Sequence, residues 1–542
     1  MQIFSCEGNI VDIQKRAIFW GRVHVSGERI TEIEVLGEEK KDKDYLMPGF
    51  VDAHVHIESS MLTPSNFARM AVCHGTVGTV SDPHEIANVL GVEGVEYMID
   101  NGKQVPFNFA FGAPSCVPAT VFETAGATID SLQVADLLSK PEIKYLAEMM
   151  NYPGVIYNDP EVMAKLHAAH IAGKPIDGHA PGLIGEDAIQ YFSQNISTDH
   201  ECYKYEEAKF KLSLGVKILI REGSAAKNFK TLIPLAHDHW ENMMFCSDDK
   251  HPDDLILGHI NLLVARAIKE EKLDLFKALT MACINPVVHY QLQIGHLRKQ
   301  DFADFIMVKD LLSFEVIATY IKGNKVAEYG QTQIPAVESK IVNHFEASPV
   351  NKSILSHPIA EQIRVIHAHD GQLITSSSLL QPKVFGDECV SDVERDLLKI
   401  VVYNRYSNST PAIAFIQGFG LKRGALASSV AHDSHNIIGV GVDDDSLAIA
   451  INSIIEAKGG VVATDGEETM CLPLPIAGLM SDLSCEIVGS KYGVIDAFAK
   501  EGLESSLSAP FMTLSFMALL VIPELKLSDL GLFDGKKFEF VT

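Results

Sequence analysis

Two histidines placed one residue apart, His54 and His56, give the clearest chemical signal in the chain. Apart from them and Asp52, residues 48–57 are apolar, glycine or proline, and such a run predicts a buried strand. Side chains two residues apart on a strand point to the same side, so both imidazoles converge at the carboxyl end of this strand. That geometry suits a metal ion, for which histidine is a common ligand.

The sequence that follows indicates the elements that position these histidines. Between residues 48 and 300, short apolar runs alternate with helical stretches of roughly a dozen residues, which is typical of βα units on a parallel sheet. Eight such units are expected, the number that closes a TIM-like (β/α)8 barrel. The expected strands cover residues 48–56, 76–80, 107–111, 143–148, 174–177, 196–200, 216–220 and 243–248.

The segments on either side of this barrel predict two further domains. Residues 1–47 and 301–335 contain short strand-like runs broken by glycines, and we expect them to form one small β-sandwich domain into which the barrel is inserted. A looser stretch that contains Pro335, Pro349 and Pro358 then leads into a third block. Residues 350–542 mix strand and helix patterns and predict a C-terminal α+β domain. The expected fold class is therefore α/β.

Polar or titratable residues end nearly every expected strand, at the face where such barrels place their chemistry. Histidines and carboxylates gathered at one face favour borderline divalent ions. We therefore expect a binuclear centre of Mn²⁺ or Fe²⁺, with Zn²⁺ as an alternative. Its six expected ligands are His54, His56, Glu148, His179, His200 and Asp248.

A carboxylate between two cations can bridge them, and Glu148 is placed to do so. Lys144 lies on the same strand with the same pleat parity, and a carboxylated lysine could serve as the bridge instead. It stands four residues earlier, too deep in the barrel to reach the mouth. Glu148 is therefore the preferred bridge.

A site of this kind lowers the pKa of a bridging water, so that hydroxide exists near neutral pH. Asp248, after the eighth expected strand, could bind one metal and also accept the proton of that water. It would then pass the proton to a leaving nitrogen. The chemistry indicated is hydrolysis of a C–N bond at an sp² carbon, in an amide, a cyclic amide or an exocyclic amine.

Longer motifs resemble a known family. The opening run 48–56, the residues His179, His200 and Asp248 and the split β domain resemble the amidohydrolase superfamily. Within it, the chain is similar to the microbial adenine deaminases over most of its length, and least so over residues 1–45. The strings that carry this resemblance are residues 56–61, 82–89, 177–183, 198–201, 221–225, 248–254, 418–425 and 431–436.

The resemblance implies hydrolytic deamination of free adenine to hypoxanthine and ammonia by a metal-activated hydroxide, a step of purine salvage. Asp248 would relay the proton, and Glu85, with His84 beside it, would hold a ring nitrogen. Glu85 and His84 could instead cap the helix that follows them. Arg221 and Glu222 either shape the substrate pocket or form a structural ion pair.

Several alternatives stay open. The enzyme could be another amidohydrolase, acting on a substituted adenine such as N6-methyladenine or on a cyclic amide. A non-catalytic scaffold would have no need of six converging ligands. His56-Ile57-Glu58 matches half of the zinc nucleobase deaminase signature, but the Pro-Cys-x-x-Cys half is absent. His432, Asp433 and His435 either bind metal or form a polar turn.

The charge of the chain excludes some classes of partner. Its 542 residues include 71 acidic and 45 basic side chains, a formal net charge of −26. Such a field repels phosphate backbones and anionic membranes, so we expect a small-molecule substrate and neither nucleic acid nor membrane as partner. We expect assembly as a homo-oligomer, specifically a dimer.

The cysteine pattern and the hydropathy favour the cytoplasm. Nine cysteines are scattered without any Cys-x-x-Cys pair, which fits a reducing compartment better than a disulfide framework. The first residues do not combine a basic segment with an apolar one, and Cys6 and Glu7 interrupt the apolar run. The mean hydropathy of +0.11 and the lack of a long uncharged apolar run predict a folded protein without a membrane span.

Overall fold

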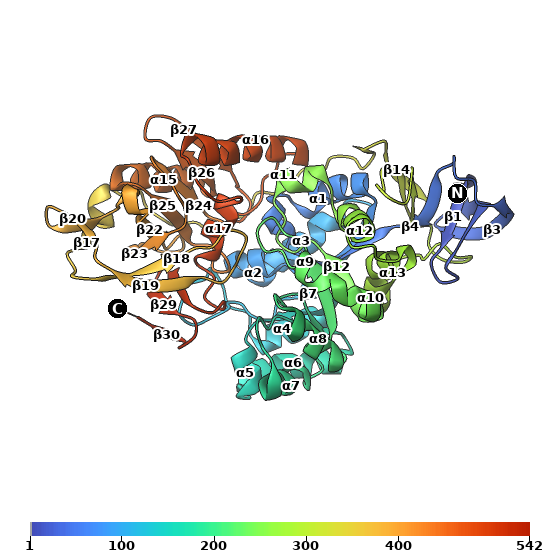
Figure 1. The fold of residues 1–542 in the computed structure, drawn as a ribbon, viewed down its shortest axis with the longest axis horizontal. Coiled ribbons are helices and arrows are strands. Elements are labelled where there is room, and N and C mark those ends of the chain that lie inside the picture. The colour runs from blue at the N-terminus through green and yellow to red at the C-terminus, as the bar shows by residue number, and fades with distance from the viewer. Residues whose placement is uncertain (1–2, 542) are drawn as a thin grey trace.

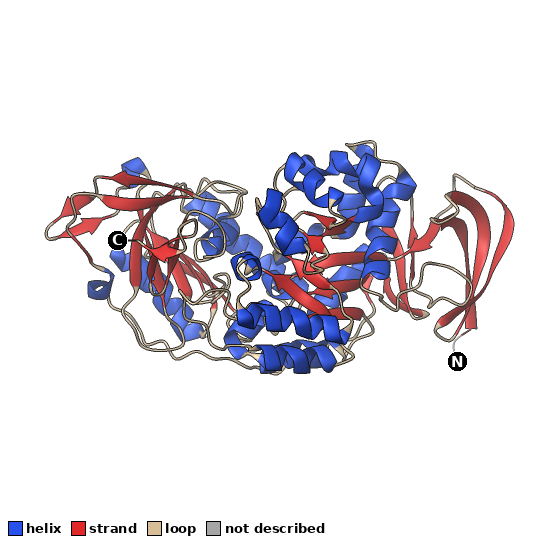
Figure 2. Cartoon of the chain, turned by 90° about the horizontal axis from the view of Figure 1, so that it is seen from below, coloured by secondary structure: helices blue, strands red, loops and turns tan. Residues whose placement is uncertain are grey.

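The computed structural model describes residues 3–541, and residues 1, 2 and 542 of the expected domains lie outside the described part. The molecule is elongated, with a β domain that contains the N-terminus at one end and a mixed domain that contains the C-terminus at the other (Figure 1). A barrel lies between them, and helices surround its strands (Figure 2).

Eight parallel strands form the barrel, as the sequence predicts. They belong to two parallel sheets of five and three strands that isolated bridges join, Ile176 to Ile196 and Val55 to Asp248. The Asp248 amide also donates to the His54 carbonyl at 3.0 Å, which closes the ring at the mouth. In order, the strands are β5 (Phe50–Val55), β6 (Thr76–Ser81), β7 (Asn108–Ala113), β8 (Ile143–Met149), β9 (Ile176–Gly178), β10 (Thr198–Asp199), β11 (Lys217–Arg221) and β12 (Met243–Cys246).

Burial on both faces explains why these strands read as apolar runs. Every residue of β5, β6 and β12 is buried, because side chains fill the barrel interior while helices cover its outside. The longer surrounding helices are α1 (Pro64–Ala71), α3 (Val92–Gly102), α4 (Ser131–Ser139), α6 (Pro160–Ala172), α7 (Gly185–Phe192), α8 (Tyr205–Ser213) and α12 (Ile260–Lys269). Shorter ones are α2 (His84–Leu90), α5 (Tyr152–Ile156), α9 (Phe229–Leu232), α10 (Ala236–His239), α11 (Pro252–Leu257), α13 (Leu275–Leu279) and α14 (Asn285–His289).

The chain segments before and after the barrel form a single eight-stranded sheet in the order β16-β15-β14-β13-β4-β1-β2-β3. Its strands are β1 (Ile3–Asp12), β2 (Ala17–Ser26), β3 (Arg29–Glu38), β4 (Tyr45–Pro48), β13 (Phe305–Val308), β14 (Val316–Ile321), β15 (Asn324–Glu328) and β16 (Gln331–Thr332). The sheet folds over on itself, since Phe4 of β1 stacks on Tyr320 of β14 at 5.5 Å although β4 and β13 separate these strands. The two layers of the expected sandwich are therefore halves of one continuous sheet.

The C-terminal α+β domain is built on a second eight-stranded sheet, ordered β19-β18-β23-β22-β25-β24-β26-β27. These strands are β18 (Ile363–His367), β19 (Ser376–Leu380), β22 (Leu398–Tyr403), β23 (Ala412–Gln417), β24 (Ala425–Ser428), β25 (Ile437–Gly441), β26 (Gly460–Thr464) and β27 (Thr469–Pro473). Small sheets are formed by β17 (His357–Pro358), β20 (Lys383–Phe385) and β21 (Glu388–Val390), and by β28 (Leu525–Ser528), β29 (Gly531–Asp534) and β30 (Glu539–Phe540).

Helices cover both faces of this sheet. On one face α15 (Asp444–Ala457) buries Leu447, Ile451 and Ile454. On the other face α17 (Pro510–Phe516) packs against β24 and β25. No helix among residues 3–541 is both long and apolar enough to cross a membrane.

The C-terminal domain is fastened to the loops that follow the barrel strands. Its helix α16 (Cys485–Ala497) packs against α11, and the Ser481 amide donates to the Met61 carbonyl at 2.8 Å. Asn436, which also belongs to the C-terminal domain, donates to the Thr124 carbonyl of the barrel at 2.8 Å. Because these barrel residues follow the carboxyl ends of strands, the C-terminal domain forms a roof over the mouth of the barrel.

A buried amine connects three segments of this roof. The fully buried Lys526 of β28 donates from Nζ to the carbonyl oxygens of Leu373 at 2.7 Å and Phe516 at 3.0 Å. Burial lowers the pKa of the Lys526 amine to about 7. In the unfolded chain a lysine keeps its proton up to a pH of about 10.

We predict that Lys526 makes stability rise with pH above 7. Between pH 7 and 10 the unfolded chain binds a proton that the folded chain has released, so alkaline pH favours folding. From pH 7 to pH 9 the wild-type free energy of unfolding should rise by about 2 kcal/mol relative to Lys526→Met. Denaturant unfolding at both pH values measures this difference, with the exposed Lys422→Met as control. Equal pH dependence in wild type and Lys526→Met would contradict the prediction.

Candidate metal centre and active site

The strand ends bring the six expected ligands to one place at the mouth of the barrel. At the end of β5, the Nε2 atoms of His54 and His56 lie 3.1 Å apart. Asp248, which follows β12, places Oδ1 3.3 Å from His56 Nε2 and 3.6 Å from His54 Nε2. These three residues form one half of the site.

Glu148, near the end of β8, stands between this half and the other. Its Oε1 lies 3.4 Å from His56 Nε2, whereas its Oε2 lies 2.5 Å from His179 Nδ1 and 3.2 Å from His200 Nε2. The ring of His200 also stacks on that of His54, with centroids 4.1 Å apart. The carboxylate thus contacts both halves of the site, which is where a bridging ligand must lie.

The donor set fits a divalent cation. His54, His56 and Asp248 offer three buried ligand atoms within 4.8 Å of one another, and so do His54, Glu148 and His200. Two imidazole nitrogens as close as those of His54 and His56 must share a proton or face a common cation. Nitrogen and carboxylate donors of this kind suit borderline metals.

Electrostatics keep both carboxylates ionised and able to bind a metal. Burial alone would raise the pKa of Glu148, but His179 and His200 outweigh it and hold that pKa well below its usual range. Burial opposes charge on Asp248 in the same way, and there Arg221 prevails and lowers the pKa. Each buried negative charge therefore has a positive partner beside it.

Arg221, the last residue of β11, orients Asp248. Its guanidinium donates to Asp248 Oδ2 at 2.8 Å and to both oxygens of Glu201, at 3.0 Å for Oε2. One oxygen of Asp248 is thereby engaged, and Oδ1 is left facing the histidines. Arg221 forms its ion pairs with Asp248 and Glu201 and none with Glu222.

A fully buried carboxylate, Asp52, aligns the two strands that carry the first half of the site. It accepts hydrogen bonds from the Ser247 amide at 3.0 Å and lies 2.8 Å from His259 Nε2. The other nitrogen of His259 contacts Thr76 Oγ1 at 2.7 Å. This network joins β5, β6 and the end of β12, so it sets His54 and Asp248 in register.

A buried lysine, Lys211 of α8, aligns the other half. Its Nζ donates to Asp199 Oδ2 at 2.6 Å, Glu207 Oε1 at 2.7 Å and the Ala180 carbonyl at 2.6 Å. Although burial opposes its charge, these carboxylates raise the pKa of Lys211. Asp199 precedes His200 and Ala180 follows His179, so one ammonium group ties both ligand-bearing loops together.

A second polar cluster joins the barrel to its roof. His84 lies with Nδ1 3.5 Å from Glu148 Oε1, and its Nε2 lies 3.4 Å from Glu85 Oε1. Both oxygens of Glu85 are held by the C-terminal domain, Oε1 by His432 Nδ1 at 2.5 Å and Oε2 by His435 Nε2. The segment 431–436, interpreted from sequence as a metal ligand or a polar turn, is thus a turn that completes the site.

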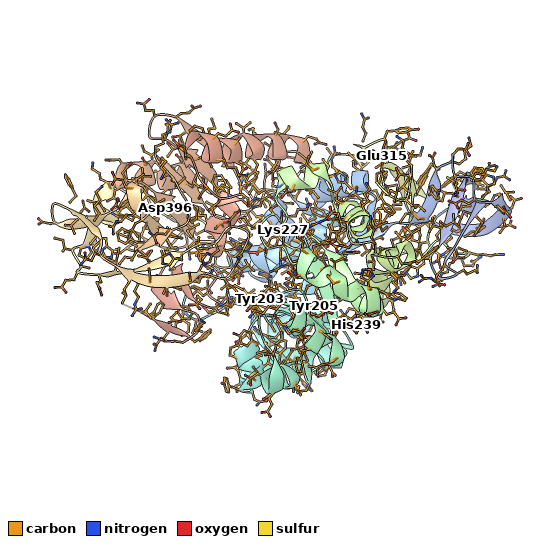
Figure 3. All side chains as sticks on the ribbon, viewed as in Figure 1. Tyr203, Tyr205, Lys227, His239, Glu315 and Asp396 are labelled. Carbon is orange, nitrogen blue, oxygen red and sulfur yellow. The ribbon has the colours of Figure 1, made fainter. Side chains whose placement is uncertain are left out.

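The cavity between barrel and roof is small, and most of its lining residues are polar or charged. Apolar side chains of the roof, Leu373, Phe516 and Leu519, cover a floor of charged groups. Its other lining residues are His56, His84, Glu85, Glu148, Met150, His179, His200, Glu201, Asp248, Asp249, His432 and Asp433. A second cavity at the same seam shares Glu201 and Leu373 with it and is lined by Tyr203 and Lys227, which lie near the junction in Figure 3.

Among the residues considered from the sequence, His54 and Arg221 contact lining residues but do not line this cavity, and Glu222 and Lys144 lie away from it. Glu222 does not line the cavity; it accepts a hydrogen bond from Arg266, whose Nη1 lies 2.8 Å from Glu222 Oε2. Lys144 donates from Nζ to the Pro141 carbonyl at the amino end of β8, so it cannot reach the centre that Glu148 occupies.

Several cavity residues were not assigned from the sequence. Glu201 and Asp249 line the cavity, and neither is among the expected site residues. Asp82 groups with His56, His84 and Glu148 as a possible metal ligand. Glu201 and Asp249 directly follow the expected ligands His200 and Asp248, and Asp82 stands two residues before His84, so proximity in the sequence was the available signal.

Comparison with known proteins agrees with this architecture. Residues 45–326 match the amidohydrolase family, and residues 372–539 match the adenine deaminase C-terminal domain. The chain is 55% identical over 540 residues to an adenine deaminase of Salinibacter ruber, covering 99% of this chain and 98% of that one. It is 50% identical over 548 residues to an adenine deaminase of Methanosarcina mazei, covering 98% of each.

The barrel and its donor set are those of an amidohydrolase, a class that implies a divalent metal. Within that class, the chain belongs to the adenine deaminase family.

We predict that Lys211 is needed to keep the second half of the site in place. Lys211→Met leaves Asp199 and Glu207 buried without a cation, which should cost about 3–5 kcal/mol of stability and weaken metal binding. Denaturant unfolding and metal content per chain measure both effects. Lys209→Met, an exposed lysine on the same helix, should match wild type. A stable Lys211→Met protein with full metal content would contradict this role.

We predict that Glu148→Gln loses metal. The amide keeps the shape of the side chain but removes the charge that faces both halves of the site, so metal affinity should fall by roughly 100-fold or more. Elemental analysis against a graded chelator measures the loss. Glu142→Gln, at the opposite end of the same strand region, is the matched control. Unchanged metal affinity in Glu148→Gln would remove Glu148 from the bridging position.

Proposed function

We propose that this protein catalyses the hydrolytic deamination of free adenine to hypoxanthine and ammonia, a reaction of purine salvage. The observation that carries the proposal is the convergence of the six expected donors at the barrel mouth, where five of them line a cavity that the adenine deaminase C-terminal domain covers. Relatives about half identical over the full length of the chain are named adenine deaminases, and this supports adenine as the substrate.

We propose a binuclear centre held by the six ligands, with Glu148 as the bridge and Mn²⁺ or Fe²⁺, alternatively Zn²⁺, as the metal. The contacts of Glu148 with His56 on one side and with His179 and His200 on the other support two metal positions. When bound, such metals lower the pKa of water, so that a hydroxide nucleophile is available near neutral pH.

Asp248 is the proposed proton relay. Arg221 occupies its Oδ2 and keeps the carboxylate ionised, so Oδ1 is free to accept a proton from the attacking water. The same oxygen can then deliver that proton to the leaving amine. Arg221 therefore acts on the reaction through Asp248.

Glu85 and His84 are the proposed groups beside the purine ring. Burial opposes charge on His432, but Glu85 raises its pKa to about 9, so the pair carries a proton at neutral pH. The proton lies on His432, whose Nδ1 is 2.5 Å from Glu85 Oε1, and this oxygen can pass it to a ring nitrogen as the ring gains charge. His84 separates Glu85 from Glu148 and so orients the base relative to the metal centre.

Sheet membership supports the proposed division into a β domain (1–47 with 301–335), a barrel (48–300) and a C-terminal domain (350–542). We propose that the enzyme works in the cytoplasm as a homodimer. The nine free cysteines, eight of them buried, suit a reducing compartment. Light scattering on the purified protein tests the oligomeric state.

Release of ammonia from adenine, adenosine and guanine, and of methylamine from N6-methyladenine, tests the proposed function. We predict that adenine is deaminated far faster than the others and that Asp248→Asn lowers kcat by about 100-fold or more, because the relay is lost. Metal content measured on the same samples separates this effect from metal loss. Asp238→Asn, an exposed aspartate, should match wild type. Comparable rates on adenosine would refute the assignment to free adenine.

A further inference from the structure

The turn 431–436 brings more than the two histidines that hold Glu85. It lies between β24 and β25, and neighbouring side chains anchor it: Tyr406 Oη donates to the Ser434 carbonyl at 2.5 Å, and Asn436 Oδ1 accepts from the Arg405 amide at 3.1 Å. The His432 amide donates to Ser515 Oγ of α17 at 3.3 Å. The turn is therefore a fixed wall of the cavity.

Two polar atoms on this wall have no hydrogen-bond partner among the described residues. They are Asp433 Oδ2 and His432 Nε2, on side chains that are each only 2% exposed and that line the cavity. The carboxylate nearest to His432 Nε2 is Asp249 Oδ1, 3.8 Å away. Leaving such groups buried and unpaired is costly, so they indicate a polar ligand in the cavity.

The position of Asp433 relative to the metal centre limits what this ligand can be. Asp433 Oδ1 lies 3.6 Å from His84 Nε2, while Glu148 Oε1 lies 3.5 Å from His84 Nδ1. The two carboxylates therefore stand at opposite edges of one imidazole ring. A flat base lying along that ring, with its amine-bearing carbon at the metal centre, would present its far edge to Asp433.

We propose that Asp433 accepts a hydrogen bond from the imidazole N–H of free adenine and thereby selects the free base against its nucleoside. This inference rests on the proposed function. An ionised carboxylate can only accept hydrogen bonds. The five-membered ring of adenine carries one N–H, at N9 or N7, whereas in adenosine N9 bears the sugar and no N–H remains. His432 Nε2 provides the second unpaired polar atom beside this edge.

Paired analogues test the proposal in the metal-loaded wild-type enzyme. 7-Deazaadenine carries its five-membered-ring N–H at the N9 position, and 9-deazaadenine carries it at the N7 position. Each has a furan counterpart in which an oxygen atom replaces that N–H. Binding constants should favour at least one N–H compound over its furan counterpart by roughly 100-fold, because the carboxylate would face an oxygen instead of a donor. Equal affinities within both pairs would overturn the proposal.

Asp433→Asn tests the residue itself. The carboxamide can turn its N–H₂ toward the furan oxygen, so the preference for the N–H compound should shrink to about threefold. Asp387→Asn, an exposed aspartate of the same domain, should keep the wild-type preference. The proposal would be overturned if Asp433→Asn kept the wild-type preference for the N–H compound. It would also be overturned if the wild-type chain bound a third metal ion that Asp433→Asn does not bind. If Asp433→Asn does not fold, the analogue pairs in the wild-type enzyme still decide the question.

Failure of this inference is distinguishable from failure of the proposed function. Absence of adenine deamination by the metal-loaded wild-type enzyme would remove the function, whatever the analogues show. Efficient deamination of adenine, combined with equal binding of each N–H compound and its furan counterpart, would leave the function standing and remove Asp433 as the selecting group.

Discussion

The structure depends on the compensation of buried charge at the mouth of the barrel. Histidines and carboxylates that lie almost completely out of water would be too costly to bury singly. Here each carboxylate is matched: Glu148 by His179 and His200, Asp248 by Arg221, and Glu85 by two histidines of the roof. The same compensation keeps the carboxylates ionised, which is the state that binds a metal or accepts a proton.

Compensation requires fixed geometry, and the surrounding framework supplies it. Asp52 aligns β5 with β12, and Lys211 ties the loops that carry His179 and His200. These two networks have the same design, in which one fully buried charged group serves several strands at once. A shift of either network would separate charges that balance one another, so the site tolerates little movement.

Much of this arrangement could be predicted from sequence because it follows from local periodicity. Parallel strands place their carboxyl ends on one face, so the positions of His54, His56, Glu148, His179 and Asp248 at strand ends predicted their convergence. Side-chain reach explains why Glu148, and not Lys144, lies at the centre. The amine of Lys144 points to the amino end of β8.

The remainder depends on contacts between segments far apart in the chain. The pairing of Glu85 with His432 joins residues 347 positions apart, and no local pattern in either segment indicates it. Glu222 was expected near the pocket because it follows Arg221, but successive side chains leave a strand end in opposite directions and it reaches Arg266 instead. The single curled sheet at the N-terminus likewise follows from β4 pairing with β13, a register that strand periodicity alone does not encode.

The roof makes the site a property of two domains. Glu85 belongs to the barrel, yet both of its oxygens contact histidines of the C-terminal domain, so the ionisation of one domain's carboxylate depends on the docking of the other. The cavity with Tyr203 and Lys227 adjoins the site at this seam and shares Leu373 with it. A small base that enters along the seam therefore meets the polar wall of the roof and the donors of the barrel together. In the proposed reaction, both domains therefore contribute residues to the same site.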